Sequence, residues 1–338
     1  MQESLISLQH FEKLLGPYGL YQHATKREPN LAEGYCVDDN ARAVIVLLAY
    51  LEQFPAEKNR VEKLLHSCFT FIQDAHHAPG TYYNFRDAKG VWLTHDVSED
   101  MYARLARTYT YTLDHDTNND RKKIALELLI DLIPTLQSLT APRAQAETVI
   151  ALAKSPEFTD VATTHIQNLL ALWKKESTPA WPWFEGSMTY ANALLPHSVL
   201  IGLPLAPNDA QEYLHASAAF LIKTTIQNNI FTPIGNIGWY SRDGIAARYD
   251  QQPIEAGTMF DFLLAYHAKF PEKVSTSALI APYKWFFGNN SKNIIMADVK
   301  TGACLDGLNV HELNQNYGAE SMLAYLWAEL LKRKYLKP

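Results

Sequence analysis

Two kinds of helical pattern alternate along this chain of 338 residues, and the alternation restricts the fold more than any other feature. The first kind is amphipathic. Between residues 57 and 74 the apolar side chains recur at the 3.6-residue spacing of one helix face, which predicts an apolar stripe with a polar back. Six segments show this pattern, at roughly residues 3–15, 57–74, 124–136, 162–173, 210–227 and 276–287.

The second kind of segment is apolar nearly all round and begins with polar or acidic residues. Asp38, Asp39 and Asn40, for example, lead into an apolar run that starts at Ala43. A helix without a polar face is buried on every side, so we expect these segments in the interior. There are again six, which start near Asp38, Glu99, Arg143, Tyr190, Gln252 and Asn316.

Six buried helices that alternate with six amphipathic ones predict an all-α (α/α)6 toroid, in which an inner ring is wrapped by an outer ring. We expect one domain over residues 1–338, with a minor β-hairpin around residues 81–85 and Trp92. An irregular all-α fold and an α-solenoid are the alternatives. The inner segments begin 61 residues apart at Asp39 and Asp100. Solenoid units are shorter, usually about 33–47 residues.

Composition excludes several classes of function. The net charge is −6 and no stripe of Lys and Arg is present, so nucleic acid is not an expected partner. The longest apolar run has nine residues, at 43–51, whereas a membrane span needs about 20. The three cysteines form no CxxC pair, and the first residues do not resemble a secretory leader. We therefore expect a cytoplasmic protein without a metal or another cofactor.

The inner helices of such a toroid all begin at the same end, so their first turns should meet at one mouth. Polar and aromatic side chains are concentrated at these positions, and aromatic faces beside fixed carboxylates and amides suit a sugar ring. Helix capping is the alternative explanation for each polar residue. The candidate substrate-binding residues are His23, Tyr35, Asn40, Arg42, Trp92, Trp183, Glu185, Tyr190, Asn192, Asn236, Trp239, Tyr240, Gln251, Gln252, Glu255, Asn316 and Glu320.

Two pairs of adjacent acids stand at equivalent places, Asp38 with Asp39 and Glu99 with Asp100. Successive helical residues point about 100° apart, so one acid of each pair can cap while the other faces the mouth. Glycoside cleavage needs two carboxyl groups on opposite sides of the bond, one of them protonated. We predict Asp39 and Asp100 as the catalytic pair, with Asp38 and Glu99 as capping or tuning partners.

Several longer motifs carry a resemblance to a known group. They are Gly34-Tyr35-Cys36-Val37-Asp38-Asp39-Asn40-Ala41-Arg42-Ala43, Ser98-Glu99-Asp100, Trp181-Pro182-Trp183-Phe184-Glu185, Met188-Thr189-Tyr190-Ala191-Asn192, Pro233-Ile234-Gly235-Asn236, Gly238-Trp239-Tyr240, Asp250-Gln251-Gln252-Pro253-Ile254-Glu255 and Asn314-Gln315-Asn316-Tyr317-Gly318-Ala319-Glu320-Ser321. Over residues 20–330 the chain resembles bacterial six-hairpin, (α/α)6-toroid proteins that are often associated with or fused to glycosyltransferases. The resemblance implies the toroid, a carbohydrate ligand and a glycosyltransferase partner.

The acid pairs are also similar in placement to the catalytic aspartates of unsaturated uronyl hydrolases, which share this fold. The chain departs from the group at Ala191, where an aspartate is frequent, and at Met101-Tyr102-Ala103-Arg104, where His-Gly-Arg is frequent. These departures leave the substrate and the mechanism open.

Three functions follow as hypotheses. The first is a metal-independent glycoside hydrolase that acts on a mono- or oligosaccharide with the paired carboxylates. The second is a non-catalytic glycan-binding or scaffold module that serves a glycosyltransferase. The third is a sugar epimerase, which would need a histidine pair at the mouth, and His23 and His95 are the candidates.

Overall fold

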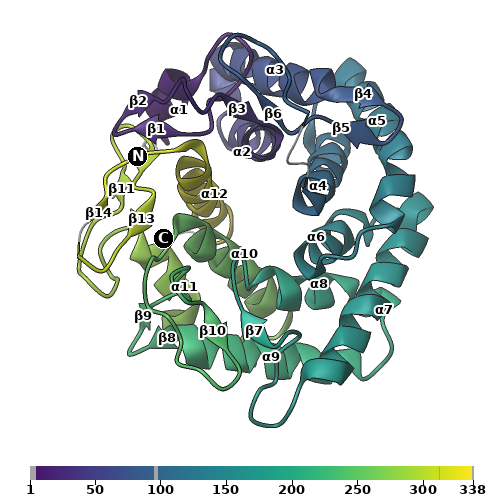
Figure 1. Ribbon diagram of the computed structural model, residues 1–338, viewed down its shortest axis with the longest axis vertical. Coiled ribbons are helices and arrows are strands. Elements are labelled where there is room, and N and C mark those ends of the chain that lie inside the picture. Colours follow the sequence, from purple (N-terminus) through teal and green to yellow (C-terminus); the bar gives the residue numbers. More distant parts are fainter. Residues whose placement is uncertain (1–4, 95–97, 312, 337–338) are drawn as a thin grey trace.

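The computed structural model describes residues 5–94, 98–311 and 313–336, and within them two concentric rings of helices (Figure 1). The inner ring consists of α2 (Val37–Gln53), α4 (Glu99–His115), α6 (Pro142–Leu152), α8 (Leu194–Gly202), α10 (Pro253–Lys269) and α12 (Ala319–Tyr335). The outer ring consists of α1 (Gln9–Leu14), α3 (Lys58–Asp74), α5 (Asn119–Gln137), α7 (Thr159–Glu176), α9 (Ala210–Thr225) and α11 (Thr276–Trp285).

The inner ring is closed. Each inner helix contacts the next one in chain order, and α12 returns to contact α2. Each of α3, α5, α7, α9 and α11 packs on the inner helix that precedes it, while α1 packs on α12 at the other end of the chain. The predicted (α/α)6 toroid is therefore confirmed, and the solenoid and irregular alternatives are wrong.

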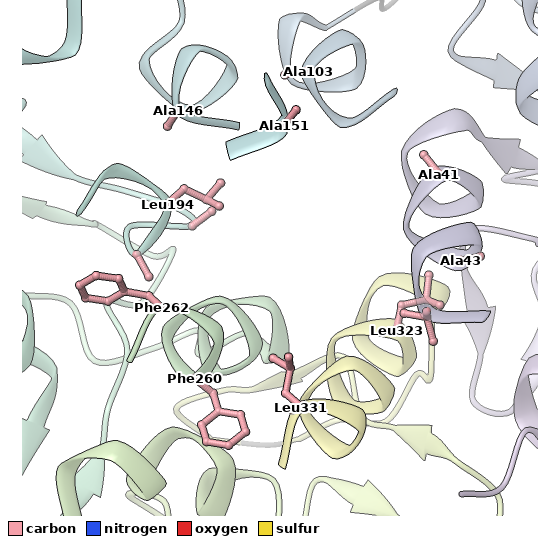
Figure 2. Packing of buried hydrophobic residues seen from close by; sticks show 14 of the residues in the cluster. Ala41, Ala43, Ala103, Ala146, Ala151, Leu194, Phe260, Phe262, Leu323 and Leu331 are labelled. Carbon is pink, nitrogen blue, oxygen red and sulfur yellow. The ribbon is translucent and has the colours of Figure 1, made fainter. Parts of the chain in front are cut away.

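The two sequence patterns produce the two rings by burial. On α3 the stripe that includes Val61, Leu65 and Ile72 is fully buried, whereas the opposite face is exposed. The inner helices are buried on several sides, and small residues let neighbouring helices approach closely. Ala41, Ala103 and Ala146 have no exposed surface (Figure 2). Close packing of this kind gives the ring a rigid wall.

Short connections join the rings at the carboxyl ends of four inner helices. These 3₁₀ turns each contain proline in their first positions: Pro55–Glu57, Pro156–Phe158, Leu203–Leu205 and Pro271–Lys273. The connections at the amino-terminal mouth are longer and contain most of the two-residue strands. Long structured loops at one face of a compact domain are usually functional.

The strands form two-stranded antiparallel pairs only. The strands are β1 (Ala24–Thr25), β2 (Glu28–Pro29), β3 (Tyr35–Cys36), β4 (His76–Ala78), β5 (Thr81–Tyr82), β6 (Phe85–Arg86), β7 (Ser187–Met188), β8 (Ile226–Gln227), β9 (Ile230–Phe231), β10 (Tyr240–Ser241), β11 (Ala297–Asp298), β12 (Ala303–Cys304), β13 (Gly307–Leu308) and β14 (Leu313–Asn314). The pairs are β1–β2, β3–β6, β4–β5, β7–β10, β8–β9, β11–β12 and β13–β14. The expected hairpin is present, because Arg86 and Trp92 form an antiparallel bridge and the Leu93 N–H donates to the Phe85 carbonyl at 2.8 Å. Its first strands also pair elsewhere, since β5 joins β4 and β6 joins β3.

Several helix boundaries differ from the sequence prediction. Helix α8 begins at Leu194 instead of Tyr190, because Ala191 has a left-handed backbone (φ 44°) and Asn192 exchanges hydrogen bonds with the backbone of Thr189. Helix α1 begins at Gln9 instead of residue 3. In the described ranges, no helix combines the length and the apolar character that crossing a bilayer requires.

Candidate active site at the amino-terminal mouth

A cavity of about 390 Å³ opens where the inner helices begin, and we call it the inner cavity. All six inner helices contribute to its wall through residues in or near their first turns, as the sequence predicts. Its lining residues are Asp38, Arg42, Ser98, Asp100, Arg104, Arg143, Glu147, Tyr190, Ala191, Leu194, Trp239, Gln252, Ile254 and Glu320.

A second cavity of about 560 Å³ adjoins the inner cavity, and we call it the outer hollow. The mouth loops and the first turns of α2 and α12 form most of it. Four residues line both spaces and mark the junction between them, namely Asp38, Arg42, Gln252 and Glu320. The outer hollow is further lined by Gln22, His23, Ala24, Thr25, Asn30, Glu33, Cys36, Asp39, Phe85, Asp250, Asp306, Asn314, Asn316, Gly318 and Ser321.

Acids and arginines four residues apart stand on the cavity faces of the inner helices. Asp38 precedes Arg42 on α2, and Asp100 precedes Arg104 on α4. Residues at this spacing lie on one helix face. The pairing nevertheless runs between helices, because Arg104 donates to Asp38 Oδ1 (2.8 Å) and Arg42 lies 3.0 Å from Glu320 Oε2. The sequence analysis missed Arg104 as a cavity residue, although its spacing from Asp100 was a usable signal.

A buried belt of charges lies deeper in the ring. Glu147, only 2% exposed, pairs with Arg107 at 3.1 Å, and Arg107 also reaches Asp261 at 3.2 Å. Burial opposes ionisation of Glu147, but Arg107 and Arg104 outweigh it and lower the pKa of this carboxyl. A narrower space of about 70 Å³ borders this belt, and Arg104 and Glu147 line both this space and the inner cavity.

The lumen opens again at the opposite end of the ring. A cavity of about 350 Å³ lies there, and residues from all six inner helices line it: Ala49, His115, Ile150, Ile201, Ala265 and Leu331. Arg107 and Asp261 also line both this back cavity and the narrower space. The charged belt therefore separates the two ends of the lumen.

Asp100 lines the inner cavity, and its two carboxylate oxygens have different surroundings. The hydroxyl of Tyr190 donates to Asp100 Oδ2 at 2.7 Å. Asp100 Oδ1 is buried and has no hydrogen-bond partner within the residues the structure describes. A buried acceptor without a partner is costly unless a ligand or a water satisfies it.

Asp39 lies beside the outer hollow and is only 5% exposed. The Cys36 thiol donates to Asp39 Oδ2 (3.1 Å), and Arg42 donates to Oδ1 (2.9 Å). Burial raises the pKa of Asp39 to about 6, although Arg42 opposes the shift. Because both oxygens already have partners, Asp39 is placed to hold Arg42. It is poorly placed for the direct contact with substrate expected of a catalytic residue.

Asp250 is a cavity carboxyl that the sequence analysis missed. It is half-buried, directly precedes the Gln251-Gln252-Pro253 start of α10, and lines the outer hollow with Asp306. Burial, and to a lesser degree the charge of Asp306, raise the pKa of Asp250 to about 6. Its position just before an inner helix could have identified it in the sequence, because acids at the starts of other inner helices were chosen as candidate site residues.

Glu99 does not line either space at this mouth. Its carboxylate accepts hydrogen bonds from the Thr140 N–H (2.7 Å), the Thr140 hydroxyl (3.0 Å) and the Ala141 N–H (2.6 Å). It therefore caps the start of the neighbouring helix α6, while Ser98 caps its own helix α4. The expected capping role is present, but it acts on a different helix.

Of the predicted substrate-binding residues, seven line the two spaces. Arg42, Tyr190, Trp239, Gln252 and Glu320 line the inner cavity, and His23 and Asn316 line the outer hollow. Trp239 reaches the cavity from the loop between β9 and α10. That loop folds back tightly, since a side chain at Gly235 would come within 2.1 Å of the Tyr249 carbonyl oxygen.

The other ten predicted residues lie elsewhere, which corrects the expectation that all of them face the mouth. Five of them are at most 1% exposed and are packed inside the protein wall around the cavities: Tyr35, Asn40, Trp183, Asn192 and Gln251. Asn40 bonds both backbone groups of Leu20, and Gln251 accepts from the Trp285 indole at 2.9 Å. Sequence position alone did not distinguish these buried supports from cavity residues.

The remaining five are partly buried supports or loop residues outside both spaces. Trp92 packs on Phe71 and Arg86, and Tyr240 packs on Trp181. Glu185 pairs with Arg143 at 2.6 Å. Asn236 donates its backbone N–H to the Asp250 carbonyl, and Glu255 accepts from the Ala191 N–H.

The sequence analysis also made predictions about histidines at the mouth and about metal binding. His23 lines the outer hollow, and His95 lies outside the described residues. Within the described ranges, no group of three or more His, Cys, Asp or Glu side chains is arranged to hold a metal ion.

Comparison with known proteins places the fold. No family model and no curated protein matches this sequence. Among solved structures, D-mannose isomerase superposes with a TM-score of 0.71 at 14% identity, covering 96% of this chain and 94% of the other. Cellobiose 2-epimerase from Bacillus thermoamylovorans gives 0.70 at 10% identity, covering 97% and 96%. A family 76 α-mannanase from Bacteroides thetaiotaomicron gives 0.61 at 11%, covering 96% and 92%. At such low identity, these similarities support the toroid fold alone.

Proposed function

We propose that this protein is a carbohydrate-active enzyme, and specifically a glycoside hydrolase whose substrate spans the inner cavity and the outer hollow. The observation that carries the proposal is the distribution of carboxyl groups across the junction of the two spaces. Asp100, with an unpaired oxygen, lies on the inner side, and Asp250, with a raised pKa, lies on the outer side. Glycoside hydrolysis needs such a pair, one ionised and one protonated.

In this proposal Asp100 activates water. A water molecule hydrogen-bonded to the Asp100 carboxylate attacks the anomeric carbon of a sugar in the inner cavity and gives its proton to that carboxylate. The Tyr190 hydroxyl donates to Oδ2 and so fixes the orientation of the carboxylate. Geometry of this kind is the first requirement of a general base.

Asp250 supplies the second proton. As the bond between the anomeric carbon and the leaving oxygen breaks, the protonated carboxyl of Asp250 gives its proton to that oxygen. A pKa of about 6 keeps a useful fraction of this carboxyl protonated near neutral pH. We assign to Asp39 the role of a positioning residue, because it fixes Arg42 at the junction through its 2.9 Å hydrogen bond.

Aromatic and polar side chains hold the sugar in this scheme. Trp239 and Tyr190, a residue that is 41% exposed, provide aromatic rings in the inner cavity. Gln252, Arg42 and Glu320 line the junction and can hydrogen-bond hydroxyl groups from fixed directions. Sugar rings combine apolar faces with polar edges, so this combination suits them.

A sugar epimerase or isomerase is the second candidate, because D-mannose isomerase and cellobiose 2-epimerase share the fold over nearly the whole chain, as the mannanase does. Such a reaction moves a proton on carbon, for which histidine is the usual base. His23 is the only histidine among the described lining residues of the two spaces, and it lies in the outer hollow.

The test is a screen of oligosaccharides with product detection, followed by variants. We expect new reducing ends from a substrate oligosaccharide. Asp100→Asn and Asp250→Asn should each lower kcat at least about 100-fold while the fold and sugar binding persist. Asp114→Asn, an exposed change at the far end of the same helix α4, serves as the control.

The pH profile provides a second readout. For the wild type, kcat/KM should fall as the pH rises above about 6, because Asp250 loses the proton it must donate. Isomerised or epimerised monosaccharide without new reducing ends would favour the second candidate. Saturable sugar binding without any product would instead support a glycan-binding module that partners a glycosyltransferase.

A further inference from the structure

The outer hollow carries an unusual balance of charge. Six of its lining residues are acids, and Arg42 is the only arginine or lysine among its described lining residues. The acids are Glu33, Asp38, Asp39, Asp250, Asp306 and Glu320. His23 is the other titratable base that lines it.

Arg42 has little capacity left for an anionic ligand. One terminal nitrogen donates to Asp39 at 2.9 Å, and the other lies 3.0 Å from Glu320. A carboxylate that approached Arg42 would have to displace one of these acids and would still face the other carboxyl groups of the hollow. Juxtaposed like charges of this kind cost binding energy and exclude wrong ligands.

The arginines of the inner cavity are engaged as well. Arg104 donates to Asp38 at 2.8 Å and lies 3.6 Å from Glu147. Arg143 donates to Glu185 and to the Tyr190 carbonyl oxygen, both at 2.6 Å. Among the described residues, neither space offers an unpaired guanidinium that could bind a sugar carboxylate in the bidentate manner.

We propose that the site selects sugars by charge: the unit in the outer hollow carries a free amino group in preference to a neutral sugar, and uronates are rejected. This inference rests on the proposed carbohydrate function and names its substrate class. An ammonium group would face six carboxyl groups, of which Asp39 and Glu320 pair with Arg42 and Asp38 pairs with Arg104. It would therefore gain attraction where a hydroxyl gains none and a carboxylate is repelled.

The experiment compares binding within three matched stereochemical series. The ligands are glucosamine, glucose and glucuronate, with the corresponding mannose and galactose series, measured by saturation-transfer NMR or calorimetry at pH 7. In the series that fits the site, we expect the amino sugar to bind about tenfold more tightly than the neutral sugar, and the uronate not to bind measurably. The preference should weaken in 1 M salt, because salt screens charges.

A pair of matched variants locates the effect. Glu33→Gln removes a carboxylate that lines the outer hollow, so it should lower the amino-to-neutral preference several-fold while neutral-sugar binding stays similar. Asp243→Asn removes an equally negative, exposed residue that lines neither space, so it should leave the preference unchanged.

The outcomes separate this inference from the function on which it rests. Binding of neutral and uronate sugars with equal strength, or a preference for the uronate, would overturn the charge selection but leave a carbohydrate site in place. An equal loss of preference in both variants would also overturn it. Failure of every sugar to bind would overturn the proposed function together with this inference.

Discussion

At the scale of single residues, adjacent acids have different roles because helix geometry points them in different directions. Asp38 lines both the inner cavity and the outer hollow and pairs with Arg104 on the neighbouring helix α4. Asp39 is turned about 100° around the helix axis, into the wall, where Cys36 and Arg42 hold it. Both residues therefore hold an arginine, but Asp38 reaches both spaces whereas Asp39 reaches the outer hollow alone.

Glu255 allows a prediction about stability and pH. It is 7% exposed and accepts the Ala191 N–H, and burial raises its pKa to about 7 despite that hydrogen bond. A folded pKa above the unfolded value stabilises the protein at low pH, and the contribution is lost as the pH rises from about 4.5 through 7. Glu255→Gln cannot ionise. The difference in unfolding free energy between the variant and the wild type should therefore shift by about 3 kcal/mol in favour of the variant between pH 5 and pH 8.

Urea unfolding at the two pH values measures this gain. Glu212→Gln, an exposed change in the first turn of α9, should leave the pH dependence of the wild type unaltered. A Glu255→Gln variant whose stability differs from the wild type by the same amount at both pH values would contradict the prediction.

Residue roles were predictable from the sequence only where position in a helix determined them. Asp38, Asp100 and Glu320 were expected at the mouth because they stand in the first turns of buried helices, and all three line the inner cavity. Trp183 was expected there too, but it is completely buried against Phe184. A loop residue can point inward or outward, and no periodicity in the sequence records the direction.

At the scale of elements, the inner helices are tied to one another by side chains at their ends. Glu99 at the start of α4 caps the start of α6 through three hydrogen bonds. Burial opposes its ionisation, but the bonds from Ala141 and Thr140 outweigh this effect and lower its pKa. The link therefore stabilises the fold at neutral pH and weakens as the pH falls through that lowered value.

Removal of this link should be measurable. Glu99→Ala leaves two backbone N–H groups and one hydroxyl at the start of α6 without their partner, which should cost about 2 kcal/mol of unfolding free energy. Urea denaturation followed by circular dichroism gives the value. Glu127→Ala on α5 removes an exposed ion pair with Lys123 at 4.0 Å and should change stability by much less. Equal effects of the two substitutions would contradict the assigned cap.

Helix type was predictable from the sequence, whereas helix starts were not. The period of apolar residues separates α3 from α2 because one helix faces water and the other does not. The start of α8 was placed four residues too early, because the left-handed backbone at Ala191 interrupts an otherwise helical sequence. A single positive φ at a non-glycine residue leaves no mark in composition or periodicity.

At the scale of the whole molecule, closure of the ring brings together residues that are far apart in sequence. The contact between α12 and α2 places Glu320 beside Arg42, although 278 positions separate them in the chain. The alternation of helix types predicts this closure. The division of the mouth into two joined spaces depends instead on the loops, which the helix pattern does not describe.

The most direct test is a crystal structure of the Asp100→Asn variant with a bound oligosaccharide that the wild type cleaves. We predict that sugar units occupy both the inner cavity and the outer hollow, with the uncleaved glycosidic bond at the junction lined by Asp38, Arg42, Gln252 and Glu320. An oligosaccharide bound in the back cavity or on the outer ring, with the amino-terminal mouth empty, would contradict the account.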